Sequence, residues 1–281
     1  MSRVAVITQP CLFPYLGYWE LLARADQIIW LDDVQWNRRS WQRRTRIHPL
    51  QPSADGEGHR WLTVPLLDSG SDKTINELTA LGPKLWLPRH WAALKGTYAD
   101  RPFFKSQLEP LFAAWAEGIA RLESAGPGGP SLRDAALLSL RLCAEHLGLA
   151  EKLDPWNGAA LLASAFPAQG TRKSERLLDL CRATHADVYY SASASTLYLD
   201  VGLFRGADID VVWQQFRQPR YAQGTYGEAL GHLGFFDLAA NVAYEDLRHW
   251  LAPNPWRPVA RREEAFARLG DLQSPTSPQT P

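Results

Sequence analysis

The chain has 281 residues, and its 30 Lys and Arg residues are balanced by 30 Asp and Glu residues, so its formal net charge is zero. With 46% hydrophobic and 21% charged residues, the composition excludes an intrinsically disordered chain. No apolar run approaches the roughly 20 residues that a transmembrane helix needs, and the first ten residues lack the apolar segment of a signal peptide. The three cysteines are widely spaced and favour neither a disulfide framework nor a zinc site. We therefore expect a folded cytoplasmic protein without a membrane span or a structural metal.

Residues 3–34 predict the first structural unit. Residues 3–8 are short and β-branched, as in a buried strand, and residues 18–25 have the apolar spacing of a helix. Residues 27–34 predict a second strand that finishes in two acidic residues. A strand, a loop, a helix and a second strand within about thirty residues favour a parallel pair, and hence an open, parallel-type α/β sheet with a Rossmann-like first βαβ unit.

The rest of the chain predicts a single α/β domain over residues 1–255 with a helical insertion at about 83–150. In the insertion, helical segments flank Pro88, and a Gly- and Pro-rich turn at 125–130 joins two amphipathic helices into a hairpin. The other predicted elements are a strand at 60–66, the hairpin helices at 106–124 and 131–149, a helix at 173–186, strands at 187–193 and 211–216, and a closing helix at 232–251. Residues 256–281 predict a C-terminal extension, frayed after about residue 269, because it is rich in Pro, Ser and Thr.

The turn after the first strand is the first candidate binding site. In open α/β sheets ligands bind at the carboxyl ends of strands, and a loop that enters a helix presents unpaired N–H groups to anions. This turn lacks the glycine pattern of a P-loop or of a dinucleotide-binding loop. It resembles the strand–loop–helix pattern of adenylylating nucleotidylyltransferases, with tyrosines in place of histidines. We expect a pocket there, although a plain structural turn is the alternative; its candidate residues are Gln9, Pro14, Tyr15, Gly17 and Tyr18.

Two acids, Asp32 and Asp33, finish the second predicted strand. Carboxylates at a strand end can hold Mg²⁺, a ribose hydroxyl or a substrate amine. Because neighbouring side chains of a strand point to opposite faces, at most one of the two faces a site unless the chain has already turned. The alternative is a helix cap or an ion pair with the arginines that follow.

Five arginines and two tryptophans lie within residues 36–46. Guanidinium groups bind phosphate in a bidentate way, and indole faces stack on bases or sugars. We expect Arg38, Trp41, Arg44 and Arg46 to hold the phosphate of a small ligand. Single-stranded nucleic acid and a solvated loop anchored by tryptophans are the alternatives.

The later part of the chain holds weaker candidates. Lys173 stands at a predicted helix start, where it could grip a phosphate, and Ser191 lies at a strand end, where serine is commonly a turn former. His90, between Trp86 and Trp91 in sequence, is a candidate catalytic residue, with a packed histidine at the edge of the core as the alternative.

A series of short motifs runs in a fixed order along residues 4–250. They lie at residues 7–10, 13–18, 31–35, 41–46, 61–65, 90–98, 173–177, 189–191, 198–200, 221–223 and 235–237. In this order and approximate spacing they resemble the WbqC-like family of bacteria. The resemblance adds Gln35, Tyr189 and Tyr198 to the candidate binding residues.

The family resemblance implies a transferase from surface-polysaccharide (O-antigen) gene clusters that attaches glycine or another acyl group to an amino sugar. Amide formation from a free carboxylate is uphill in water, so the acid needs activation as an adenylate, a thioester or an aminoacyl ester. This route suggests ATP with Mg²⁺ as cofactor and a nucleotide-activated amino sugar as substrate, with Asp32 or Asp33 as the Mg²⁺ ligand or the base. A non-catalytic nucleotide- or anion-binding module remains open, and so does a single-stranded nucleic-acid binder, against which the zero net charge argues.

Overall fold

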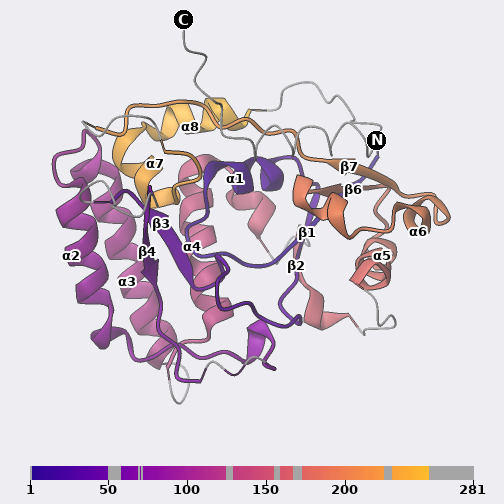
Figure 1. Ribbon diagram of the computed structural model, residues 1–281, viewed down its shortest axis with the longest axis horizontal. Helices are drawn as coiled ribbons and strands as arrows, with labels where there is room; N and C mark the ends of the chain where they lie inside the picture. The colour runs from indigo at the N-terminus through magenta and orange to yellow at the C-terminus, as the bar shows by residue number, and fades with distance from the viewer. Residues whose placement is uncertain are drawn as a thin grey trace, which may run out of the picture.

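A five-stranded parallel sheet lies at one side of the molecule (Figure 1). The computed structural model describes residues 2–49, 58–68, 70, 72–124, 129–154, 159–166, 173–224 and 230–252. The strand order is β5-β2-β1-β6-β7, and all four pairings are parallel. The strands are β1 (Val4–Thr8), β2 (Gln27–Trp30), β5 (Ala160–Leu162), β6 (Val188–Ser191) and β7 (Asp210–Trp213). The predicted α/β class is therefore confirmed.

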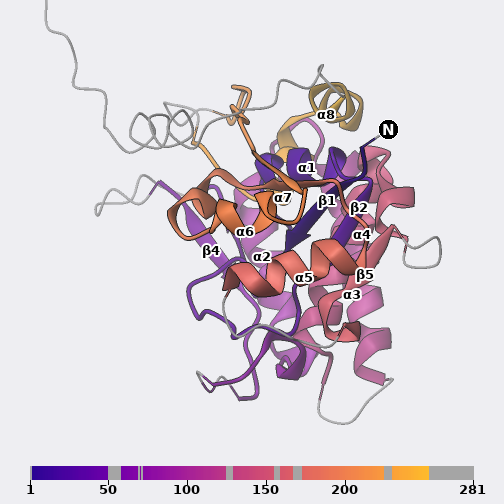
Figure 2. The same cartoon turned by 90° about the vertical axis from the view of Figure 1, so that its right-hand side faces the viewer.

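Both faces of the sheet are covered, which explains why the strands are apolar throughout. Along β1, Val4 and Val6 belong to one core cluster, whereas Ala5 and Ile7 belong to another on the opposite face. The helices α5 (Lys173–Ala183) and α6 (Val201–Arg205) cover the second face and lie nearest the viewer in Figure 2. On the first face, α1 (Leu16–Ala23) buries Leu16, Trp19 and Leu22.

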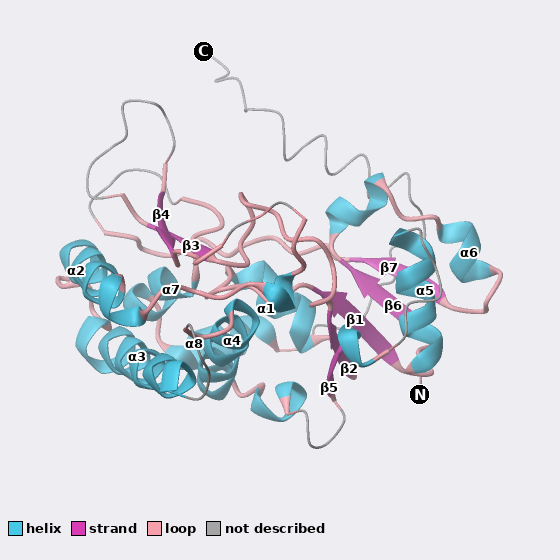
Figure 3. Ribbon diagram, turned by 90° about the horizontal axis from the view of Figure 1, so that it is seen from below, coloured by secondary structure: helices cyan, strands magenta, loops and turns pink. Residues whose placement is uncertain are grey.

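The larger core continues from α1 into a helical region beyond the first face, seen at the left of Figure 3. Its helices are α2 (Leu87–Tyr98), α3 (Glu109–Ser124), α4 (Leu132–Leu147), α7 (Phe235–Asn241) and α8 (Tyr244–Leu251). A small antiparallel pair, β3 (Arg44–Ile47) and β4 (Arg60–Thr63), lies against this region, with α7 close to β3 (Figure 1).

The sequence did not predict the pairing of β3 with β4. The strand expected at 60–66 exists as β4 but ends at Thr63, and its partner comes from the Arg- and Trp-rich stretch. The second predicted strand is also shorter than expected. It ends at Trp30, because the N–H of Asp32 donates to the carbonyl of Trp30 at 2.9 Å and turns the chain.

The prediction of one closing helix over 232–251 is wrong, because two helices occupy this range. Val242 and Ala243 adopt extended backbone angles between α7 and α8. The side chain of Gln107 satisfies the interrupted backbone: its Nε2 donates to the carbonyls of Ala239 and Val242 at 3.0 and 2.7 Å, and its Oε1 accepts from the N–H of Tyr244 at 2.8 Å. An amide from elsewhere in the chain thus replaces the helical hydrogen bonds.

Some predictions fall outside the described residues. These are most of the turn at 125–130 and the C-terminal extension at 256–281. Within the part of the chain that the structure describes, no helix combines the length and the apolar character that crossing a membrane requires.

Candidate functional site

The strand order indicates where a ligand site is expected at the carboxyl edge of the sheet. From β1 the chain moves outward to β2 and β5, and it returns on the other side of β1 to form β6 and β7. The order therefore reverses between β1 and β6, and ligands of open α/β sheets bind outside the carboxyl ends of the strands at such a reversal. The loops that follow β1 and β6 are thus the first place to look for a site.

The loop between β1 and α1, residues 9–15, is held in one conformation from several sides. The N–H of Leu12 donates to the carbonyl of Trp41 at 2.9 Å. The carbonyl of Phe13 accepts from the Thr45 hydroxyl at 2.8 Å and from the N–H of Phe235 at 3.0 Å. Phe13 has a φ of 42°, in the left-handed region that non-glycine residues rarely adopt. Such strained residues persist where the surroundings over-determine them and often mark functional loops.

Four of the predicted pocket residues mainly build this loop. The carbonyl of Gln9 accepts from the Tyr18 hydroxyl at 2.7 Å, and the side chain of Gln9 accepts from Gln42 Nε2 at 2.6 Å. Pro14 is buried. At Gly17, a Cβ would lie 2.6 Å from Tyr15 Cε2 and 2.9 Å from Phe216 Cδ1, so a larger residue would have to displace these two rings. The missing side chain lets the Tyr15 ring lie over the start of α1.

Six side chains around this loop form what we call the aromatic–guanidinium cluster: Tyr15, Trp41, Arg44, Arg46, Trp61 and His232. Its rings are in contact, with centroid distances of 5.4 Å for Tyr15–Trp41, 5.3 Å for Trp41–Trp61 and 5.0 Å for Tyr15–His232. The Arg44 guanidinium carbon lies 3.8 Å from the Trp61 ring centroid. That of Arg46 lies 5.3 Å from the Trp41 ring centroid and 5.0 Å from that of Trp61.

The β3–β4 pairing explains this arrangement. Arg44 and Arg46 are two residues apart on β3, so they share a face, and Arg46 stands opposite Trp61 in the antiparallel register. Tyr15 comes from the β1–α1 loop, and His232 comes from the segment before α7. Three separate segments thus meet at the loop that follows the central strand.

The cluster is cationic at neutral pH. Burial lowers the pKa of His232, and the nearby Arg46 lowers it further, so this imidazole is neutral at pH 7. Burial raises the pKa of Tyr15, which therefore keeps its proton. The cluster consists of two guanidinium groups and four neutral rings, which suits an anion attached to a flat or sugar-like group.

Asp32 and Asp33 are ion-paired, but with arginines far along the chain. Asp32 is fully buried; its Oδ1 accepts from the Ser164 N–H at 3.0 Å, and its Oδ2 accepts from the Ser164 hydroxyl at 2.8 Å and from Arg133 at 3.3 Å. Asp33 Oδ2 accepts from Arg176 at 2.6 Å. Asp33 Oδ1 is buried and has no hydrogen-bond partner among the described residues.

This environment fits Mg²⁺ poorly, because guanidinium groups occupy carboxylate oxygens that a metal would need. In the described ranges, no three His, Cys, Asp or Glu side chains gather in a way that could hold a metal ion. The residues at this edge therefore do not suit a bound Mg²⁺.

The candidates of the second half lie around the end of β6 and the start of α5. The Ser191 hydroxyl is 3.1 Å from the Tyr189 hydroxyl and 2.9 Å from that of Ser195, and all three side chains are buried. Burial raises the pKa of Tyr189. Lys173 and Tyr198 are exposed, with Lys173 Nζ 5.7 Å from the Tyr198 ring centroid.

His90 lies apart from the two acids, beside β4. It is buried on α2, its Nε2 is 3.1 Å from the carbonyl of Thr63, and its ring packs on Trp86 at 5.0 Å. Burial lowers its pKa to about 4. Gln35 and Arg38 are exposed on the connection between β2 and β3, and Gln35 forms a β-bridge with Thr74.

The sequence model described as the WbqC-like protein family matches residues 9–249, which include the whole cluster and both acids. The chain belongs to the WbqC-like protein family. It is 29% identical over 246 residues to "Uncharacterized protein Rv1507c" of Mycobacterium tuberculosis (strain ATCC 25618 / H37Rv), covering 87% of this chain and 96% of that protein. No solved structure matches the chain.

The structure adds residues that the sequence did not single out as a site in this WbqC-like chain. Trp61 and His232 complete the cluster, and Arg133, Ser164 and Arg176 hold the two acids. Trp61 and Arg176 lie in two of the short segments on which the resemblance to the family was predicted, at residues 61–65 and 173–177, so a signal for them was present. For His232, Arg133 and Ser164 the sequence holds no comparable signal, because only the fold brings them to their partners.

Side-chain hydrogen bonds hold in place the part of the chain that carries Phe216 and His232. The Tyr221 hydroxyl donates to Asp237 Oδ2 at 2.7 Å, and the Gln223 side chain bonds both backbone groups of Leu230 at 2.9 and 2.6 Å. Burial raises the pKa of Asp237. Asp237 and Tyr221 lie within the range that matches the family model, and their hydrogen bond holds together the chain beside the β1–α1 loop.

Proposed function

We propose that this WbqC-like protein is a transferase that joins an activated acyl or aminoacyl group to the amine of a small substrate. The phosphate or nucleotide part of that substrate binds at the aromatic–guanidinium cluster. The observation that carries the proposal is the stacking of Arg44 and Arg46 on Trp41 and Trp61 beside the β1–α1 loop, next to the reversal of strand order.

The stacking favours phosphate binding. A guanidinium that lies over an indole ring has lost part of its conformational freedom already, so less entropy is lost when it binds an anion. Guanidinium N–H groups bind phosphate oxygens in the guanidinium plane. Arg44 Nε donates to the carbonyl of Ser40 at 3.2 Å and its Nη2 donates to that of Arg39, so these bonds also hold the side chain in place, and a phosphate would compete with them. The tryptophan and tyrosine rings offer apolar faces to a sugar or a base.

The two acids that follow β2 could bind the amine of the substrate, and this supports the proposed reaction. In the proposed step, the substrate nitrogen attacks the acyl carbon, the activating group leaves with its bonding electrons, and the proton of the nitrogen passes to the departing group or to water. Asp32 has both oxygens occupied, whereas Asp33 Oδ1 accepts no hydrogen bond from the described residues. We assign the Asp33 carboxylate, whose side chain is 23% exposed, to accept a hydrogen bond from the substrate amine and so orient its lone pair.

Binding is tested by thermal unfolding and titration calorimetry with ATP and with a nucleotide-activated amino sugar. We expect at least one of them to stabilise the protein, and Arg46→Ala to weaken its binding about tenfold or more. Arg205→Ala, on the exposed surface of α6, is the matched control and should bind as the unaltered protein does. If neither ligand shifts the melting temperature at millimolar concentration, the cluster is not a nucleotide site.

Catalysis is tested by incubating the protein with an activated glycyl donor, such as glycyl adenylate or a glycyl thioester, and a nucleotide-activated amino sugar, and following the mass of the sugar. We expect addition of a glycyl group, with Asp33→Asn retaining ligand binding but forming product about 100-fold more slowly. Tight binding without product, for every donor tried, would indicate a non-catalytic binding module instead. Mass spectrometry of ligand carried by freshly purified protein would name the substrate directly.

A further inference from the structure

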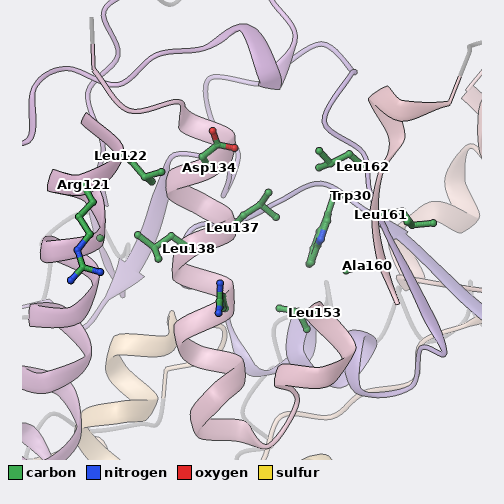
Figure 4. Close-up of a pocket in the computed structure, with 12 residues that line it drawn as sticks. Trp30, Arg121, Leu122, Asp134, Leu137, Leu138, Leu153, Ala160, Leu161 and Leu162 are labelled. Carbon is green, nitrogen blue, oxygen red and sulfur yellow. The ribbon is translucent and has the colours of Figure 1, made fainter. Parts of the chain in front are cut away.

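A cavity of about 540 Å³ lies between the helix pair α3–α4 and the edge strand β5 (Figure 4). None of the six residues of the aromatic–guanidinium cluster lines it. Its walls are aliphatic: six leucines line it, at positions 122, 137, 138, 153, 161 and 162. Trp30 of β2 adds one ring, which faces Leu137 of α4 across the cavity in Figure 4.

The charged groups that line the cavity are two arginines and one aspartate, and each has an ion-pair partner. Arg121 of α3 and Arg141 of α4 line it, with side chains 76% and 77% exposed. Asp134 is its one acidic residue, and Arg133 Nε donates to Asp134 Oδ1 at 2.9 Å, so that carboxylate is already neutralised. The two arginines pair with Glu117 and Glu145 one turn away, but exposed pairs of this kind are weak and exchange readily for another anion.

We propose that this cavity binds a single-chain amphiphile, with its aliphatic chain among the leucines and its anionic head on Arg121 and Arg141. The volume lies within the range of small-molecule pockets, and an apolar wall with a few polar groups is their usual composition. Leucine walls favour a flexible aliphatic chain, and guanidinium groups favour a carboxylate or a phosphate head. The proposal does not depend on the transferase activity.

The probe for this site is dodecanoate, used below its critical micelle concentration. It should raise the melting temperature of the full chain and displace a fluorescent polyunsaturated fatty acid. Dodecyl phosphate should do the same, because it shares the chain and the negative charge, and a ranking of the two shows which head group the site prefers. Dodecanol, which has the chain without the charge, should bind about tenfold or more weakly.

Two variants connect the binding to the cavity. At Gly118, a Cβ would lie 2.5 Å from Leu138 Cδ2, so Gly118→Ala should push the Leu138 side chain into the cavity and weaken dodecanoate binding about tenfold. Alanine suits a helix interior, so the fold should be retained. Gly96→Ala, at an exposed position of α2, is the matched control and should bind normally. Arg141→Glu should weaken dodecanoate binding but leave dodecanol binding unchanged.

Three results would overturn the proposal. The first is no stabilisation and no displacement by either anionic amphiphile. The second is equal binding by the unaltered protein and the Gly118→Ala variant, which would place the ligand elsewhere. The third is equal binding of dodecanol and dodecanoate, which would remove the role of the two arginines.

Discussion

The guanidinium of Arg176 joins three segments at the carboxyl edge of the sheet. Its Nη2 lies 2.6 Å from Asp33 Oδ2, 2.7 Å from the carbonyl of Ala163 and 3.0 Å from that of Phe166. The residue is 8% exposed, so water does not replace these interactions easily. A buried cation of this kind matters less for its own attraction than for the groups that its removal would leave unpaired.

We expect Arg176→Met to lower the free energy of unfolding by about 3–5 kcal/mol, because a carboxylate and two carbonyls would lose their donor. Urea denaturation followed by circular dichroism measures the change. Arg182→Met, at an exposed position of the same helix, is the control and should change the free energy of unfolding by less than about 0.5 kcal/mol. Equal midpoints for the two variants would show that Arg176 does not hold this edge together.

His90 gives a second prediction at the scale of single residues. Its pKa is lowered from 6.5 to about 4, chiefly by burial, so the unfolded chain binds the proton more readily than the native protein does. The contribution of His90 to the free energy of unfolding should therefore be fully present above about pH 6.5. It should fall by up to about 3 kcal/mol as the pH is lowered towards 4. Urea denaturation between pH 4 and 7 measures the loss, and His90→Gln should reduce it. A pH dependence that is unchanged by the substitution would contradict this role.

At the scale of elements, α7, β3 and the β1–α1 loop meet at Gly234. The N–H of Gly234 donates to the carbonyl of Arg46 at 2.7 Å. A Cβ on Gly234 would lie 2.8 Å from the carbonyl oxygen of Phe13 and 2.9 Å from that of Arg46, and it would also collide with the Thr45 hydroxyl. Because backbone atoms surround the position, no side chain can move aside to make room.

Gly234→Ala should therefore destabilise the protein by about 3 kcal/mol and displace the β1–α1 loop from β3. Gly231→Ala is a close control, since nothing lies within 4 Å of a Cβ at that position. Thermal unfolding measures stability, and the binding assay described above reports the loop, because Tyr15 depends on it. A Gly234→Ala variant as stable as Gly231→Ala would show that the junction can open.

At the scale of the whole molecule, the charges balance in number but are unevenly distributed along the chain. The 30 basic and 30 acidic residues cancel, while five arginines gather within residues 36–46. Several of these arginines are stacked on tryptophans or bonded to the backbone of the same stretch. The charge that remains is local, and it suits a small anion better than a polyanion.

We accordingly expect no tight binding of a labelled single-stranded oligonucleotide at physiological salt, measured by fluorescence anisotropy. A basic nucleic-acid surface would instead produce affinity that falls steeply as the salt concentration rises. Lysozyme, a basic protein, serves as a positive control for charge-driven binding in the same assay. Micromolar, salt-sensitive binding by the present protein would favour the nucleic-acid alternative and weaken the small-anion proposal.

Wherever the signal is local, the sequence predicted the fold well. The unit of β1, α1 and β2 follows from β-branched and helical patterns within about thirty residues, and the predicted resemblance to the WbqC-like family is confirmed over residues 9–249. The split of the closing helix could not be predicted, because Gln107, 137 residues before Tyr244, supplies the hydrogen bonds at the break. The same holds for the pairing of β3 with β4.

The candidate site likewise combines features that the sequence predicts with features that only the fold creates. By itself, the sequence determined an α/β protein of the WbqC-like family with an acidic pair after β2 and a stretch rich in Arg and Trp. Only the tertiary structure decided that Asp32 and Asp33 pair with Arg133 and Arg176, 101 and 143 residues away, and not with the neighbouring arginines. It likewise brought His232 onto Tyr15. The physical reason is that periodicity and turn chemistry act over a few residues, whereas the partner of a buried charge is selected by which segments the packed core places side by side.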